Sequence, residues 1–410
     1  MELREASRSV DRIHRHAGGG IRRIAEAAGL TIVEGDGSYL IDDRGRRYLD
    51  FVSGYGVAAL GHRHPHWVEA VTAQANTLST SPFHNDALGT YLERLAAVLP
   101  PVPNRTALFS GGAEAVEASL RLTQLASGRA GVLAFDSAFH GKTAGVRFAG
   151  GRCENERRYL GLASWVYSAE LGPSLSRCLA DRDDLDEIGT VIVEPVLGTA
   201  GNIPLREGLL AELRSICDAR GWLLVFDESQ TGFGRTGWHF AADRFGVTPD
   251  VLVMGKAMGG GFPLSGVAAP AELWSAGGLD QPSATSSSYG SNPLACAAGT
   301  AVLDVLAAPD FLAGVRNVSG LLAEGLMRLA DESPYLSWPR GVGMMLGFDL
   351  VDPEGGGPAG PALCSQVFQG CRDRGLLLAA DIPRVRLNPP LILSRGEAEQ
   401  ALGIIGEVLT

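Results

Sequence analysis

The apolar positions of this chain follow two different spacings. Short runs of consecutive apolar or small residues recur through its middle, at 107–109, 131–135, 190–193, 222–226 and 251–254. Between them, apolar residues three and four positions apart predict helices at 114–126 and 209–219. Strands without polar alternation are usually buried on both faces, so we expect a largely parallel sheet covered by helices.

The spacing of apolar residues is different at the two ends of the chain. Residues 38–41 and 47–51 alternate around the polar turn Asp42-Asp43-Arg44-Gly45, which is typical of a β-hairpin. Helices are predicted at 65–77, 88–99, 293–307, 312–329 and 397–409, and strands at 343–350 and 385–387. We therefore expect an N-terminal segment, 1–60, that joins a small C-terminal α+β domain, 306–410, beside a large domain, 61–305.

The composition is that of an ordinary globular protein of 410 residues, of which 45% are hydrophobic and 20% are charged. The formal charge is −11 and the 35 Lys and Arg residues are scattered, so neither nucleic acid nor a membrane surface is an expected partner. Residues 1–20 lack the apolar stretch of a signal peptide, and no later stretch is long enough to span a bilayer. We expect a cytoplasmic protein.

Neither the cysteines nor the histidines predict a metal site. The six cysteines lie far apart without a C-x-x-C pair, and reduced thiols are expected. His62, His64 and His66 alternate and could share one face of a strand, but Pro65 would interrupt that strand and no acidic or Cys partner is near in the sequence. We therefore expect no metal ion.

The stretch 227–237, DESQTGFGRTG, contains the spacing G-x-G-x-x-G of dinucleotide-binding turns. In such a turn the first glycine ends a strand and the third lies inside the following helix, with an acid about 20 residues later. Here five residues separate Phe226 from Gly232, Asp227 precedes the glycines, and 236–238 does not begin a clear helix. The dehydrogenase interpretation is therefore disfavoured.

Asp227 and Lys256 indicate a different chemistry. Each follows a buried apolar strand, and open parallel sheets bind ligands at the carboxyl ends of their strands. Lys256 stands between such a strand and three glycines, which suits a reactive amine better than a solvated surface charge. Lysine forms Schiff bases with carbonyls, and pyridoxal phosphate requires both that lysine and an acid at its pyridine nitrogen.

This cofactor would also need a phosphate site and an aromatic face. The turn Ser110-Gly111-Gly112-Ala113 precedes the strongest helical pattern of the chain, where unpaired N–H groups and the helix dipole favour an anion. Phe139 follows the strand 131–135 at the expected sheet edge. Its ring could lie against a planar cofactor or be part of the core.

With these residues, the chain resembles the class III (ω-type) aminotransferases of the fold type I pyridoxal phosphate enzymes over essentially its whole length. The resemblance rests on motifs in the family's order: YLDF at 48–51, GHRHP at 61–65, GAEAVE at 112–117, FHGKT at 139–143, VEPV at 193–196, DESQTGFGRTG, Pro249-Asp250 with Lys256, YGSNPLA at 289–295 and RLNPPL at 386–391. It implies an α/β fold with a large cofactor-binding domain on a mostly parallel seven-stranded sheet, a small α+β domain, and a homodimer with active sites at the subunit interface.

The resemblance also implies roles for individual residues. Lys256 matches the Schiff-base lysine that moves the substrate proton, and Asp227 matches the acid that keeps the pyridine nitrogen protonated. The remaining cofactor-binding residues it implies are Gly111, Gly112 and Ala113 at the phosphate, Phe139 on the ring, His140, Glu194, Ser229 and Gln230 around it, and Ser288 reaching the phosphate of the neighbouring subunit. Glu194 is expected to order the wall of the site rather than to react.

Substrate binding is predicted at three positions. Arg386 matches the family's carboxylate-binding arginine, whose guanidinium can hold a carboxylate with two parallel hydrogen bonds. An ion pair that fixes the small domain is the alternative role for this arginine. Tyr55 and Phe83 fall where the family lines its substrate pocket.

The chain departs from the family at positions that affect the substrate and the cofactor. Thr199 stands where glutamate-using members carry a second Glu that pairs with the carboxylate-binding arginine, so the usual dual-substrate switch is in doubt. Ser229 replaces an apolar residue that lies against the cofactor ring. Ser110-Gly111 replaces the family's usual Asn-Ser, and Ser288 replaces the usual Thr, so we expect cofactor binding to differ from that of the family.

The leading functional hypothesis is an aminotransferase that moves an amino group between an amino acid or primary amine and a keto acid or aldehyde. Thr199 and Ser229 motivate a second hypothesis, another reaction of an amino-acid aldimine: decarboxylation, racemisation, elimination or carbon–carbon bond formation. A binding protein that has lost catalysis is disfavoured because Asp227, Gln230 and Lys256 are all present.

Overall fold

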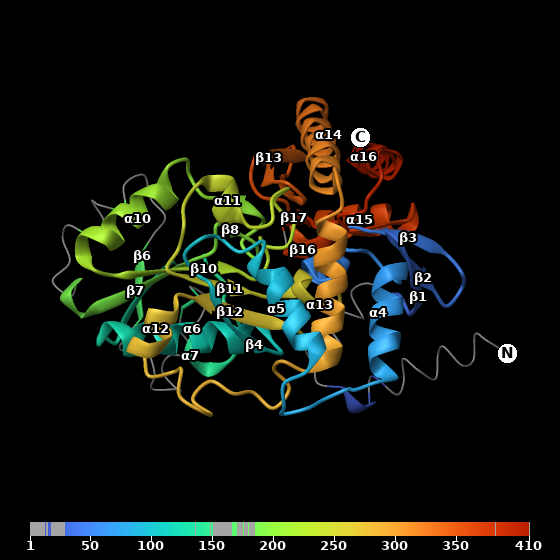
Figure 1. The fold of residues 1–410 in the computed structure, drawn as a ribbon. Coiled ribbons are helices and arrows are strands. Elements are labelled where there is room, and N and C mark those ends of the chain that lie inside the picture. The colour runs from blue at the N-terminus through green and yellow to red at the C-terminus, as the bar shows by residue number, and fades with distance from the viewer. Residues whose placement is uncertain are drawn as a thin grey trace.

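A computed structural model describes residues 29–135, 137–147, 149–150, 166–169, 185–381 and 383–409, together with 13, 15–17, 175 and 179. Figure 1 shows a large part built around a central sheet, with a smaller part at the upper right that contains α14 (Phe311–Glu332), α15 (Pro361–Asp373) and α16 (Arg395–Leu409). The blue strands of the N-terminal region lie beside this smaller part.

The central sheet contains seven strands, in the order β4 (Arg105–Phe109), β12 (Ser265–Ala269), β11 (Val251–Met254), β10 (Leu223–Glu228), β7 (Ile188–Val193), β5 (Gly131–Phe135) and β6 (Val166–Ala169). Strands β11, β10, β7, β5 and β6 are parallel, whereas β12 runs antiparallel to both β11 and β4. The predicted mostly parallel sheet is confirmed. Strand β12, rich in small residues, was not predicted because Ser265-Gly266 weakens its apolar pattern.

Apolar side chains cover both faces of this sheet. On β10, Val225 belongs to a buried cluster that includes residues of α6 (Gly112–Ser127) and α12 (Ala271–Ala276). Leu224 and Phe226 belong to the cluster on the other side, which includes residues of α13 (Pro293–Leu306). Alternate residues of a strand face opposite sides, so an unbroken apolar run is what a doubly covered strand requires.

Two four-stranded sheets form the smaller part and its link to the N-terminal region. Strands β1 (Ile32–Asp36), β2 (Tyr39–Asp42) and β3 (Arg47–Asp50) are antiparallel, and β3 pairs in parallel with β15 (Leu376–Leu377). The other sheet has the order β13 (Leu336–Val342), β14 (Met345–Leu350), β17 (Arg384–Leu387) and β16 (Ala379–Asp381). The predicted hairpin is confirmed, while the domain boundaries at 60 and 305 stay a prediction.

The remaining described elements are α3 (Ser53–Gly56), α4 (Pro65–Ala75), α5 (Asp86–Ala96), α7 (Ala144–Arg147), α10 (Leu209–Arg220), α11 (Ala241–Phe245), the strand pair β8 (Val196–Leu197) and β9 (Ile203–Pro204), and the 3-10 helices η2 (Leu185–Glu187) and η3 (Lys256–Gly259). Strand β13 was not predicted from the sequence, because Pro339 and a register shift between Ser337 and Arg340 interrupt the alternation of apolar and polar residues. Helix α15 was also not predicted, because polar residues separate the few apolar residues of its buried face.

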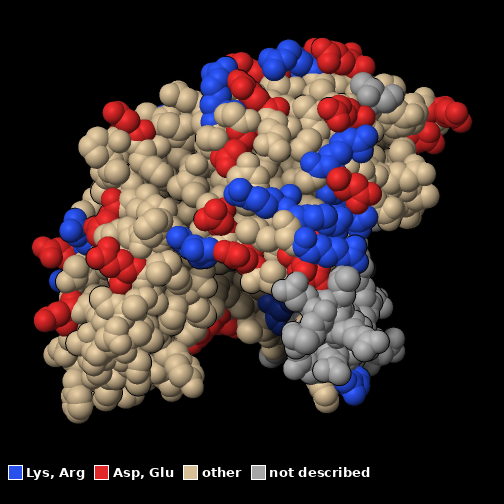
Figure 2. Space-filling view, turned by 90° about the vertical axis from the view of Figure 1, so that its right-hand side faces the viewer, with Lys and Arg blue, Asp and Glu red and all other residues tan. Residues whose placement is uncertain are grey.

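Among the described helices, none is by itself long and apolar enough to cross a membrane; α13 and α14 together meet those criteria but are bent by 74° where they join. The face in Figure 2 carries Lys and Arg side chains interspersed with Asp and Glu side chains. Cys217, Cys296, Cys364 and Cys371 are buried free thiols, as predicted; Cys153 and Cys178 lie outside the described residues.

Candidate active site

The candidate site lies at the carboxyl ends of the parallel strands. Asp227 is the penultimate residue of β10 and is aligned with Val253 of β11, so Lys256, which follows β11 after Gly255, reaches the same edge. Lys256 has a positive φ of 41°. A non-glycine residue in that region is held there by its surroundings, here the extended Gly255 and the short helix η3 that Lys256 begins.

Asp227 is paired with a buried histidine. His140 Nδ1 lies 2.7 Å from Asp227 Oδ2, and the two side chains are 0% and 3% exposed. Burial raises the pKa of Asp227, but His140 and the Ser229 N–H, which donates to Asp227 Oδ1 over 3.0 Å, outweigh it and lower the pKa below its usual value. Burial likewise lowers the pKa of His140, and Asp227 more than compensates, so the pKa of His140 is raised. Both directions favour the charged form of the pair.

The Lys256 amine is held by the side chain of Gln230. Lys256 Nζ donates to Gln230 Oε1, and Gln230 Nε2 donates to Asn388 Oδ1 over 3.4 Å. Burial lowers the pKa of Lys256 to about 8; the charges of Glu194 and Asp227 raise this pKa, and the charges of Arg386 and Arg235 lower it. An amine with such a pKa is partly neutral near pH 7 and can act as a nucleophile.

Glu194 accepts backbone hydrogen bonds beside Phe139, and its predicted role in ordering the wall of the site stays a prediction. Its Oε1 accepts a 2.8 Å hydrogen bond from the Phe139 backbone N–H, and its Oε2 accepts one of 3.3 Å from the Gly198 N–H. Burial raises the pKa of Glu194, although the charge of His140 opposes this. Thr199, which follows Gly198, lines a small cavity together with Phe139 and His140.

The N-terminus of α6 forms the third side of the site. Gly111 precedes the helix in an extended conformation, no described side chain caps it, and a Cβ at Gly111 would meet nothing within 4 Å. Ser229 lies against the next residue: a Cβ at Gly112 would come 3.5 Å from Ser229 Oγ. That hydroxyl is buried and hydrogen-bonded to no described group. Ala113 follows in the first turn of α6.

Two of the predicted substrate-binding residues lie together. Arg386 is in β17, 5% exposed, and its guanidinium carbon is 5.5 Å from the centre of the Tyr55 ring. Tyr55 is in α3, has a φ of 63° and is 41% exposed. The charge of Arg386 lowers the pKa of Lys256, so the pair is near enough to act on the amine electrostatically.

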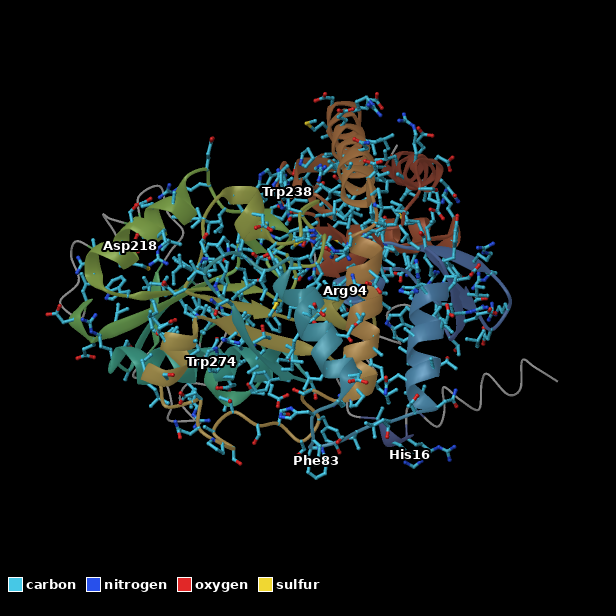
Figure 3. The ribbon with its side chains drawn as sticks, in the orientation of Figure 1. His16, Phe83, Arg94, Asp218, Trp238 and Trp274 are labelled. Atoms are coloured by element: carbon cyan, nitrogen blue, oxygen red, sulfur yellow. The ribbon has the colours of Figure 1, made fainter. Side chains whose placement is uncertain are left out.

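Phe83 and Ser288 are not brought to these residues within one chain. Phe83 projects from the lower edge of the molecule in Figure 3 and is 79% exposed. Ser288 is exposed on the segment before Asn292, the N-cap of α13. Their assignments stay predictions, and both would require a second subunit.

The alternating histidines diverge in the structure. His62 Nε2 lies 2.9 Å from Asp50 Oδ2, whereas His66 Nε2 lies 3.3 Å from Asp304 Oδ2 on another helix. Pro65 does not interrupt a strand but begins α4, because proline is well accommodated in the first turn of a helix. Across the described part of the chain, no group of three potential ligands is placed to hold a metal ion.

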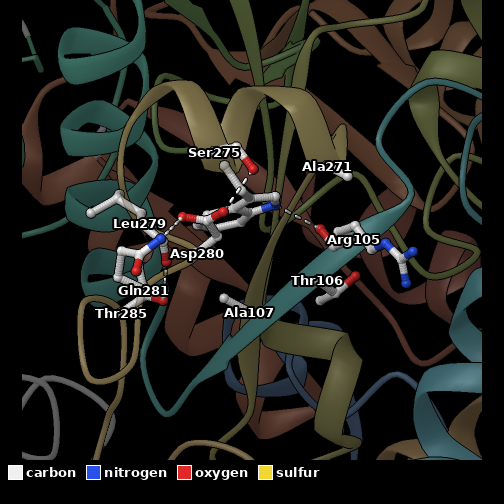
Figure 4. A pocket seen from close by; sticks show the side chains of 10 residues that line it. Arg105, Thr106, Ala107, Ala271, Ser275, Leu279, Asp280, Gln281 and Thr285 are labelled. Atoms are coloured by element: carbon white, nitrogen blue, oxygen red, sulfur yellow. Dashed lines mark hydrogen bonds between the residues drawn. The ribbon is translucent and has the colours of Figure 1, made fainter.

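A larger hollow lies elsewhere and does not share these residues. Its volume is about 460 Å³, and it is lined by residues of β4, α12 and the segment that follows (Figure 4). Its polar groups are paired with one another: Trp274 Nε1 donates to the Arg105 carbonyl over 3.2 Å, and Ser275 Oγ to Asp280 Oδ2 over 2.7 Å. They do not converge on a ligand.

Sequence reasoning missed two buried residues of the site. Arg235 is 0% exposed and lies beside Gln230, and Asn388 is 0% exposed and accepts hydrogen bonds from Gln230 and Asn202. Both residues stood in quoted motifs. Nothing in a local pattern shows that Arg235 and Asn388 fold back onto the site, because their hydrogen-bond partners lie over 100 residues away in the sequence.

The Aminotransferase class-III family model matches residues 23–409. The chain belongs to the class-III aminotransferase family. It is 34% identical to the 2-aminoadipate transaminase of Pseudomonas putida over 93% of this chain and 95% of the relative. Two solved structures are each 27% identical and cover 93% of this chain and 94% of their own: an amine transaminase from an uncultivated Pseudomonas species in its pyridoxal-phosphate-bound form, with a TM-score of 0.83, and a phospholyase from Arthrobacter in complex with phosphoethanolamine, with a TM-score of 0.82.

Membership of this aminotransferase family confirms the predicted fold type I architecture, the predicted aminotransferase activity and the predicted cofactor, pyridoxal phosphate. The chain's own residues fit that cofactor. The uncapped N-terminus of α6, with open space before Gly111, suits a phosphate. The ionised Asp227 suits a protonated pyridine nitrogen, and the Ser229 hydroxyl still has a hydrogen bond to give.

Proposed function

We propose that Lys256 is the amine that binds the carbonyl of pyridoxal phosphate in this aminotransferase, and that Asp227 is the acid at its pyridine nitrogen. One observation supports this above the others: the Lys256 amine, with a pKa lowered to about 8, is held by Gln230 at the same sheet edge as the buried Asp227–His140 pair. A solvated lysine on the protein surface would have neither the lowered pKa nor the hydrogen bond to Gln230.

When bound, pyridoxal phosphate supplies an electron sink that stabilises negative charge on the substrate carbon next to nitrogen. Asp227, kept ionised by His140 Nδ1, holds a proton at the ring nitrogen. Lys256 Nζ would accept the proton of the substrate carbon next to nitrogen and return it to the carbon on the other side of that nitrogen, which its lowered pKa allows near neutral pH. The wall of Glu194 and Phe139 excludes water from one side.

The preferred substrates are amino acids whose carboxylate binds Arg386. This guanidinium is fixed by strand β17 on one side and by the Tyr55 ring on the other, and its charge acts on Lys256. The curated relative from Pseudomonas putida is named for an amino acid, 2-aminoadipate. Because Thr199 carries no charge to pair with Arg386, we expect both the donor and the acceptor to bring a carboxylate.

The enzyme functions as a cytoplasmic homodimer in this proposal. Ser288 and Phe83 are exposed in the single chain, where a second subunit could receive them. Ser288 would then reach the cofactor phosphate of the partner. The chain's negative formal charge of −11 disfavours nucleic acid and anionic membranes as additional partners.

A second function, elimination from an amino-phosphate, is supported by the phospholyase of similar fold that binds phosphoethanolamine. It would use the same lysine and the same acid but would need no keto-acid acceptor. A panel of amino acids and phosphorylated amines, assayed with and without an acceptor, separates the two functions. Products that form without an acceptor would favour elimination.

The role of Lys256 has a direct chemical test because the chain contains two lysines, Lys142 and Lys256. Borohydride treatment of the cofactor-loaded enzyme should fix the cofactor on the peptide that contains Lys256. Lys256→Ala should lose both this label and turnover, whereas Lys142→Ala, at an exposed position, should keep both. A label that survives in Lys256→Ala would refute the assignment.

A further inference from the structure

Arg235 is a fully buried arginine that connects three distant parts of the chain. It lies in the turn after β10, and its side chain is among the largest that are fully buried. Its Nη1 donates to the carbonyls of Pro389 and, over 3.4 Å, Met344, and its Nη2 donates to the carbonyl of Gly56 over 3.4 Å. One guanidinium thus joins the N-terminal helix α3 to the C-terminal sheet region.

The charge of Arg235 is balanced by carbonyl dipoles rather than by an acid. Burial alone lowers its pKa to about 10, and the ion pairs found among the described residues do not include it. A buried guanidinium normally sits opposite a carboxylate, since removing a charge from water is costly. The arrangement therefore leaves a positive field inside the protein.

The positive charge of Arg235 lies near two parts of the candidate active site, the wall that carries Tyr55 and the Gln230 side chain that holds Lys256. A Cβ at Gly56 would come 3.8 Å from Arg235 Nη2 and 3.9 Å from Gln230 Cγ. Gly56 follows Tyr55, the residue against which Arg386 packs, and Gln230 holds the Lys256 amine. Arg235 is therefore placed between the substrate wall and the residue that orients the lysine.

We propose that Arg235 is a positioning residue of this active site: its hydrogen bonds hold the wall that carries Tyr55, and its uncompensated charge favours the neutral form of the Lys256 amine. The proposal rests on the function proposed for Lys256. Arg235 itself is too deeply buried to touch a substrate, so it acts only through Tyr55, Gln230 and the electrostatic potential at Lys256.

The charges that act on Lys256 show why this contribution matters. Glu194 and Asp227 favour the protonated amine, whereas Arg386 and Arg235 disfavour it. Arg386 would be neutralised whenever a substrate carboxylate binds to it. Arg235 has no such partner, so its effect persists through the reaction, at the stage when Lys256 must accept a proton and then release it.

The test measures the protonation of Lys256 separately from turnover. In enzyme loaded with pyridoxamine phosphate, the Lys256 amine is free, and trace acetylation by acetic anhydride as a function of pH reports its titration. Exposed Lys142 provides a reference within the same molecule. Arg235→Met should raise the titration midpoint of Lys256, the direction in which loss of a positive charge moves a neighbouring amine, and leave Lys142 unchanged.

Two further variants separate charge from structure. Arg235→Lys loses the three-way hydrogen bonding, so it should raise KM for amino-acid donors severalfold. Arg316→Met removes a charge at an exposed site that donates to Gly237, and should change neither the Lys256 midpoint nor KM. If Arg235→Met does not fold, Arg235→Gln, which keeps two donors for the carbonyls, provides the same comparison.

The outcomes are distinct. An unchanged Lys256 midpoint in the neutral variants would overturn the electrostatic role, and an unchanged KM in Arg235→Lys would overturn the positioning of the substrate wall. Neither result depends on which residue carries the cofactor. That question is answered by the borohydride label on Lys256.

Discussion

Replacing His140 by Phe removes the histidine that pairs with the buried Asp227. The side chains of His140 and Asp227 are 0% and 3% exposed, and the atoms that join them are 2.7 Å apart. In the variant, Asp227 would keep its interactions with Ser229, whose N–H donates to it over 3.0 Å. A ring of similar size fills the space, so the change isolates the charge and the hydrogen bond.

The expected loss of stability is large because the remaining carboxylate is buried. Removing one partner of a buried ion pair typically costs about 3–5 kcal/mol in the free energy of unfolding. The exposed pair of His66 and Asp304 provides a matched control, since its side chains are 46% and 29% exposed and 3.3 Å apart. His66→Gln should cost less than about 1 kcal/mol.

The pH dependence follows from the two pKa shifts. The pKa of His140 is raised above its reference of 6.5, so its contribution is complete below pH 6.5 and is lost as pH rises through the folded-state value. The pKa of Asp227 is lowered below 3.8, so its contribution is complete above pH 3.8 and is lost as pH falls through the folded-state value. The difference between wild type and His140→Phe should therefore be greatest between these two references.

Urea unfolding of cofactor-free protein, followed by tryptophan fluorescence at fixed protein concentration, measures this difference at several pH values. Cofactor-free protein is used so that a ring nitrogen does not compete for Asp227. A His140→Phe penalty no larger than that of His66→Gln, or one that grows as pH rises above neutrality, would show that the buried pair is not charged.

Three other substitutions test the remaining features of the site. Ser229→Val should weaken pyridoxal phosphate binding about fivefold, the value of one ordinary hydrogen bond, and unchanged affinity in a fluorescence titration would show that the hydroxyl does not contact the cofactor. Gly198→Ala would place a Cβ 2.4 Å from Gln230 Oε1 and should lower kcat by displacing that amide from the lysine, so a variant with normal kcat would contradict the contact. Thr199→Glu supplies the acid that this chain lacks and should increase the use of primary amines relative to amino acids, measured as a ratio of kcat/KM; a constant ratio would refute our account of Thr199.

The parts of the fold that could be predicted from the sequence are those decided by short-range patterns. The buried strands β5 and β11 have the predicted limits, since an apolar run flanked by polar or glycine residues fixes both ends. Placing Asp227 and Lys256 at one edge also required only the direction of two parallel strands, and the structure has them there. Their roles stay predictions that the variants above address.

Features that depend on three-dimensional packing could not be predicted in this way. The pairing of His140 with Asp227 joins residues 87 positions apart, and the hydrogen bonds of Arg235 to Pro389 and Gly56 join residues 154 and 179 positions apart. The sequence shows only that His140 and Arg235 belong to motifs of the family. It could not show which nitrogen meets which oxygen, because that depends on how separate elements dock.

The glycines of the site illustrate the same limit. By their number alone they predicted tight turns, and Gly234 and Gly237 do have positive φ values of 86° and 84°. Gly112, Gly198 and Gly255 have no such conformation; a Cβ at Gly112 or Gly255 would make ordinary contact with Ser229, whereas one at Gly198 would clash with Gln230. Gly198 is the clearest case, since its missing Cβ leaves the space that Gln230 needs to reach Lys256. Lys256 is therefore positioned partly by the absence of a side chain at Gly198, which only the packed structure can reveal.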